Sequence, residues 1–137
     1  MIKKISNLIN SSYVWFIAFL ILIFSNLLFN KAEATPTFVD SFSIASQETS
    51  PIGLVFNNDG TKMFVLGDDG NDVNEYLLTT AYDLSTASFV DAHSIATEES
   101  DPRGLAFDDD GDRLYVGGNT GNDVNQYPLV TGYDIST

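Results

Sequence analysis

The sequence predicts an all-β fold built from two copies of one small antiparallel sheet, preceded by an N-terminal apolar helix. Three observations predict this fold: the chain after residue 37 repeats itself with a period of 51 residues, short runs of alternating apolar residues fill each repeat, and one long apolar run lies near the N-terminus. The 137 residues suffice for one small domain or for part of a larger one. The chain has no cysteine, which excludes disulfides, thiolate metal sites and a cysteine nucleophile.

Residues 1–34 have the three parts of a secretory signal peptide. Two lysines near the start precede an apolar stretch over residues 13–29, and the small residues Ala32 and Ala34 form a cleavage site. We therefore predict cleavage after Ala34. The alternative is an uncleaved N-terminal anchor, since 17 apolar positions lie at the short limit for crossing a bilayer. The membrane would then be a partner only through this segment.

In both cases residues 35–137 are expected to be exported, to a periplasmic, extracellular or cell-surface location. This part retains three basic and 18 acidic side chains, a formal charge of −15. Nucleic acid binding rewards clustered Lys and Arg, so this charge excludes nucleic acid as a partner.

Two repeats, residues 38–86 and 89–137, fill the remainder of the chain. Aligned without a gap they give 49 pairs, of which 27 are identical. The segment Gly70–Asn74 recurs unchanged as Gly121–Asn125. A period of this length is typical of a solenoid, a propeller or an array of modules.

A complete unit of about 50 residues is predicted to form one four-stranded antiparallel sheet, and the chain holds one complete unit and one that is split between its two ends. The strands expected in the first unit are residues 53–56, 62–66, 72–78 and 88–96, separated by Asp, Asn and Gly turn signals. Residues 103–130 repeat the first three strands, and residues 38–45 correspond to the fourth.

Alternation along the strands separates two faces of this sheet. One face carries apolar positions that recur in both repeats. The opposite face is predicted to be less apolar, because Val55 becomes Ala106 and Leu77 becomes Pro128 in the second repeat. A single such sheet cannot bury its own surface, so neighbouring sheets must stack. The recurring apolar positions are Ile44, Leu54, Phe56, Met63, Val65, Tyr76 and Leu78, which return as Ile95, Leu105, Phe107, Leu114, Val116, Tyr127 and Leu129.

The pattern Pro-x-Gly-Leu-x-Phe-x-x-Asp-Gly-x-(Lys/Arg)-(Met/Leu)-(Phe/Tyr)-Val stands at Pro51–Val65 and again at Pro102–Val116. It resembles the blade signature of YVTN-type and NHL-like β-propellers, in the lactonase-like propeller superfamily. The resemblance implies that residues 35–137 form about two β-propeller-type blades.

Propellers close with four to eight blades. The chain is therefore expected either to be a fragment of a longer protein or to form a homo-oligomer that completes one ring. In a closed ring, the N-terminal strand at residues 38–45 would pair with the last blade.

The sequence offers no catalytic or cofactor-binding set. His93 is the only histidine and no partner for it is identifiable. Asp108, Asp110 and Asp112 are weak candidates for a metal site that would bind calcium, although their spacing does not match an EF-hand loop. Their other interpretation is a strand-connecting turn, for which Asp and Gly are typical. No further cofactor is expected.

These features predict an exported repeat module that binds or scaffolds a protein or small-molecule ligand whose identity the sequence leaves open. One alternative is part of a lactonase-like hydrolase, which would need metal ligands converging on a central channel. A second alternative is a repetitive cell-surface structural protein.

Overall fold

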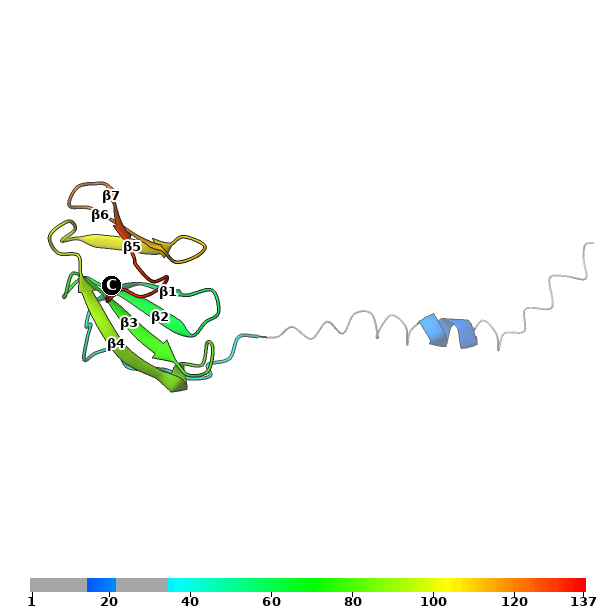
Figure 1. Ribbon diagram of the computed structural model, residues 1–137. Coiled ribbons are helices and arrows are strands. Elements are labelled where there is room, and N and C mark those ends of the chain that lie inside the picture. The colour runs from blue at the N-terminus through cyan, green and yellow to red at the C-terminus, as the bar shows by residue number, and fades with distance from the viewer. Residues whose placement is uncertain (1–14, 22–34) are drawn as a thin grey trace, which may run out of the picture. The chain divides into compact units, whose positions relative to one another are not determined.

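The computed structural model describes residues 15–21 and 35–137 (Figure 1). Residues 15–21 are helical, which agrees with the predicted N-terminal apolar helix over that short stretch. The remainder of the signal peptide or anchor, including the cleavage site at Ala34, lies outside the described residues and stays a prediction. Within the described part of the chain, no helix combines the length and the apolar character needed to cross a membrane.

The strands predicted at residues 53–56, 62–66, 72–78 and 88–96 form one four-stranded antiparallel sheet, here called sheet A, to which the first repeat contributes three strands and the start of the second repeat the fourth. Its strand order is β1-β2-β3-β4, so each strand pairs with its neighbour in sequence. A short 3-10 turn, η1 (Leu84–Thr86), precedes β4 and is capped by Asp83, whose carboxylate accepts a hydrogen bond from the Ser85 amide. The strands are β1 (Pro51–Phe56), β2 (Lys62–Gly67), β3 (Asp72–Leu78) and β4 (Ala87–Ser94).

The second repeat forms sheet B, with strands β5 (Pro102–Phe107), β6 (Arg113–Gly118) and β7 (Val124–Pro128) in that order. Residues 103–130 thus supply the three strands predicted for them, and the two sheets are not closed into a ring. The prediction that fails is the fourth strand at residues 38–45. Residues 35–44 form no strand and do not pair with β7. The physical reason is their position, because Phe42 and Ile44 pack on a face of sheet A instead.

Equivalent turns with a glycine at the same position connect the first two strands of each sheet. Gly60 and Gly111 both have positive φ, of 73° and 75°, which glycine adopts without steric cost. A side chain at either glycine would also collide with a ring, of Tyr82 at Gly60 and of Tyr133 at Gly111. Each tyrosine amide donates to the carbonyl of its glycine, at 2.9 and 3.0 Å. The repeated glycine and tyrosine therefore belong to one tertiary contact.

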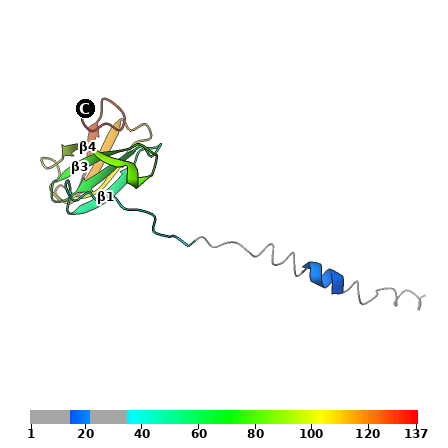
Figure 2. The ribbon, with the colours of Figure 1, turned by 90° about the horizontal axis from the view of Figure 1, so that it is seen from below.

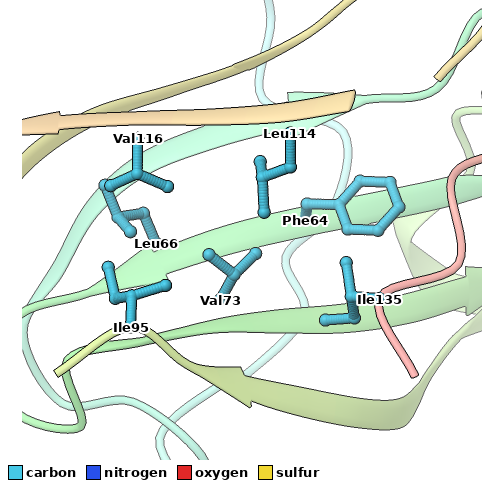
Figure 3. Packing of buried hydrophobic residues seen from close by; sticks show 7 residues of the cluster. All are labelled: Phe64, Leu66, Val73, Ile95, Leu114, Val116 and Ile135. Atoms are coloured by element: carbon cyan, nitrogen blue, oxygen red, sulfur yellow. The ribbon is translucent and has the colours of Figure 1, made fainter. Parts of the chain in front are cut away.

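The main core lies between the two stacked sheets (Figures 1 and 2). We call the face that carries Leu54, Met63, Val65 and Tyr76, or their counterparts in sheet B, the front face, and the opposite face the back face. The back face of sheet A packs on the front face of sheet B. Figure 3 shows the buried members of this core: Phe64, Leu66, Val73, Ile95, Leu114, Val116 and Ile135.

The back face of the first repeat is more buried than its sequence predicts. Phe64, Leu66 and Val73 have no exposed surface, because sheet B covers them. The equivalent positions of the second repeat are Tyr115, Gly117 and Val124, and Val124 is 69% exposed. The same sheet position is thus core in one repeat and surface in the other.

Truncation of Val73 to alanine is expected to lower the free energy of unfolding by about 1.5–3 kcal/mol, because it removes fully buried methyl groups. The matched change Val124→Ala at the same position of sheet B should cost less than about 0.5 kcal/mol, since that side chain is exposed. Urea unfolding followed by far-UV circular dichroism measures both values. Equal losses in the two variants would contradict the stacking of sheet A on sheet B.

Candidate functional site

The front face of sheet A is apolar, and within residues 39–137 no second sheet covers it. Its buried residues are Met63, Val65, Tyr76 and Leu78, and Phe42, Ile44, Phe56, Leu84 and Ala87 pack against them. In sheet B the equivalent face is covered by sheet A. In sheet A, the partial cover consists of residues 42–44 and of the link that contains Leu84.

This incomplete cover leaves a groove of about 310 Å³ beside β1 and β2. Leu54 is 54% exposed at its rim. Apolar side chains that converge on a concave surface are typical of binding sites for other molecules. The groove is lined by Phe42, Ile44, Pro51, Ile52, Gly53, Leu54, Met63, Val65 and Leu84.

The contact between the two sheets is an example of a front face bound by a neighbouring sheet, because the back face of sheet A covers the front face of sheet B. Lys62, on sheet A, forms an ion pair with Glu75 at 2.7 Å and donates to the carbonyl of Tyr133 at 2.6 Å. Glu75 in turn accepts a hydrogen bond from the Ile135 amide at 3.2 Å. Both side chains thereby hold the last residues of the second repeat against the back face of sheet A. The side chain of Glu75 is only 2% exposed, so these bonds compensate for burying its charge.

Replacing Glu75 with alanine should lower the free energy of unfolding by about 3 kcal/mol, because it leaves Lys62 and the Ile135 amide without their acceptor. The control is Gln126→Ala, since Gln126 is the equivalent residue of the second repeat and is exposed on sheet B. That change should cost less than about 0.5 kcal/mol. Thermal unfolding of both variants is the measurement, and a loss at Gln126 as large as at Glu75 would contradict the anchoring role.

The aspartates proposed for calcium lie in the turn between β5 and β6. Asp108 accepts hydrogen bonds from the Arg113 amide and guanidinium, at 3.0 and 3.1 Å. Partial desolvation works to raise the pKa of Asp108, but the bonds from Arg113 outweigh it and the pKa is lowered. Among the described residues, no three acidic or histidine side chains come close enough together to hold a metal ion. Asp110 and Asp112 thus form no such group with Asp108, and calcium binding stays a prediction.

His93 lies at the interface between the sheets. Its ring meets the ring of Tyr127 edge-on, with centroids 5.6 Å apart and planes at 75°. Phe42, at the equivalent position of the first repeat, meets Tyr76 with the same separation and a plane angle of 78°. The two pairs have the same geometry, which indicates a packing role for His93.

Two buried glutamates, Glu48 and Glu99, were missed by the sequence analysis. The carboxylate of Glu99 accepts bonds from the amides of Asp101 and Thr120, at 2.7 and 3.2 Å, and Glu48 likewise accepts from the Ser50 amide. A hydrogen bond from the Thr120 side chain is the main cause of a lowered pKa at Glu99, and the two amide bonds lower it further. A side chain at Gly118 would overlap Glu99, and one at Gly67 would overlap Glu48. Their recurrence at a spacing of 51 residues was the available signal.

Tyr127 has a buried hydroxyl. Desolvation, together with the negative charges of Glu98, Glu99 and Asp123, raises its pKa to about 12. Its hydroxyl has no hydrogen-bond partner within the described structure. The charged phenolate is therefore disfavoured in the folded state.

Because the folded pKa of Tyr127 lies above the ordinary value of 10, the neutral phenol contributes its full stability below pH 10. That contribution should be lost as the pH rises from 10 to about 12. The free energy of unfolding of Tyr127→Phe should consequently fall less steeply with rising pH over this range than that of the wild type. Thermal unfolding at stepped pH, with tyrosinate absorbance as a second readout, measures the effect, and identical pH profiles would refute it.

A scan against protein-family models finds no match to the chain, and a search of curated proteins finds none either.

Proposed function

We propose that the chain is an exported β-propeller-type repeat module whose function is to bind or scaffold a partner, through the front face of sheet A. The observation that carries the proposal is the contrast between the two repeats. The same apolar front-face positions occur in both, and in sheet B they are covered by a neighbouring sheet. In sheet A they border a groove of about 310 Å³ with Leu54 at its rim.

An apolar groove of this kind is costly to leave in water. Burial of apolar surface contributes about 25 cal/mol per Å², so a partner that covers the groove gains this free energy on binding. Polar contacts accompany the apolar contact between the two sheets. There Lys62 and Glu75 of sheet A bind backbone groups of Tyr133 and Ile135, in the segment after β7. The proposed partner therefore presents an apolar surface flanked by backbone-binding polar groups.

A segment of residues 35–137 contains both cores and suits a direct binding test with the neutral apolar dye Nile red. The dye should show enhanced, blue-shifted emission with the wild-type segment, and Leu54→Asp should weaken its binding at least fivefold. Val130→Asp is the matched control, because Val130 is 87% exposed and does not line the groove. Equal dye binding by both variants would contradict a binding role for this face, and metal-dependent hydrolysis of a lactone by the segment would favour the hydrolase alternative.

A further inference from the structure

We propose that the front face of sheet A binds the back face of sheet B from a second copy of this chain. Copies would then join head to tail, in the way that the two sheets join within one chain. The inference rests on the proposed function, since it uses the same face, and it commits that face to one partner.

The apolar contact that would form between copies has a counterpart inside the chain. Leu105 of sheet B packs over Gly53 of sheet A so closely that a Cβ at Gly53 would lie 2.8 Å from its Cδ2 atom. The equivalent leucine of sheet A is Leu54, which is 54% exposed. The equivalent glycine of sheet B is Gly104, whose Cβ position has no atom within 4 Å. One copy thus offers the protruding leucine, and another offers the unfilled space that matches it.

Two polar contacts between the sheets also have counterparts at a junction between copies. Within the chain, Lys62 donates to the Tyr133 carbonyl and Glu75 accepts from the Ile135 amide. A shift of 51 residues replaces Lys62 with Arg113 and Glu75 with Gln126, both on sheet B. Arginine is again a donor and the glutamine side chain again has an oxygen acceptor. Their targets would be the carbonyl of Tyr82 and the amide of Leu84, the counterparts of Tyr133 and Ile135.

One polar contact does not transfer. Asn58 donates its side-chain amide to the Asp109 carbonyl within the chain. The counterpart of Asn58 is Asp109, whose carboxylate has no proton to donate at neutral pH. The junction between copies therefore retains the leucine contact and two polar contacts, and it loses a bond at the exposed turn.

A free strand edge lies where the junction would need one. In sheet A, β4 pairs with the outer edge of β3, and Ala92 lies opposite Asn74. In sheet B the corresponding edge, on β7, has no strand partner among the described residues. Residues 40–43 are equivalent to residues 91–94 of β4, and their Phe42 already lies on Tyr76 as His93 lies on Tyr127. Docking a second copy would bring its β7 beside this segment, with Asn125 opposite Ser41.

This register can be tested in the full chain, which has no cysteine of its own. Opposed residues of antiparallel strands have Cα atoms about 4.5–5.5 Å apart, within reach of a disulfide. A mixture of the single variants Ser41→Cys and Asn125→Cys should form a disulfide-linked dimer on mild oxidation, at least tenfold more than either variant alone. The double variant Asn74→Cys with Ala92→Cys, which are opposed within one chain, controls for the efficiency of oxidation.

A second substitution separates docking from non-specific association. Gly104→Val, added to the Asn125→Cys chain, should lower the yield of linked dimer at least fivefold, because it fills the space for Leu54 from a Cβ position that has no atom of its own chain within 4 Å. Ala96→Val, in the exposed turn after β4, is the matched control and should leave the yield unchanged. Circular dichroism verifies that all variants fold.

The proposal is overturned if the mixed pair links no more than the single variants, or if Gly104→Val and Ala96→Val give the same yield. Nile red binding that depends on Leu54, without cross-linking of the mixed pair, would retain the proposed function and reject a second copy as the partner. Loss of both signals would reject the two proposals together.

Discussion

The structure of residues 39–137 depends on the packing of one sheet face against another. A three- or four-stranded sheet with apolar residues on both faces cannot bury them by itself. Here the back face of sheet A supplies Phe64, Leu66 and Val73, and the front face of sheet B supplies Leu114 and Val116. The strands of each sheet satisfy their backbone groups locally, but the stacking of the sheets removes the side chains from water.

The repeats reuse the same tertiary contacts, which explains why certain residues recur. Gly60 and Gly111 each accommodate a tyrosine ring from the link that follows the third strand. Glu48 and Glu99 each occupy the space beside a glycine and accept bonds from nearby amides. Each unit therefore needs the chain segments that precede its first strand and follow its third strand.

Much of the local structure could be predicted from alternation and turn residues alone. The four strands of sheet A begin and end close to the predicted residues, since Asp, Asn and Gly turns separate them. The fourth strand expected at residues 38–45 does not form, because strand formation requires a neighbouring edge that local sequence cannot specify. The groove was also beyond prediction, since it depends on which of two similar faces is covered.

The sequence by itself determined the repeat, the strands of sheet A, the apolar character of the front faces and the high negative charge of residues 35–137. Only the tertiary structure decided that Val73 is core while Val124 is surface, although both follow the same Gly-Asn-Asp segment. The physical reason is that burial is a property of a pair of surfaces. A residue's own pattern shows which face it occupies, whereas the presence of a neighbouring sheet decides whether water reaches it.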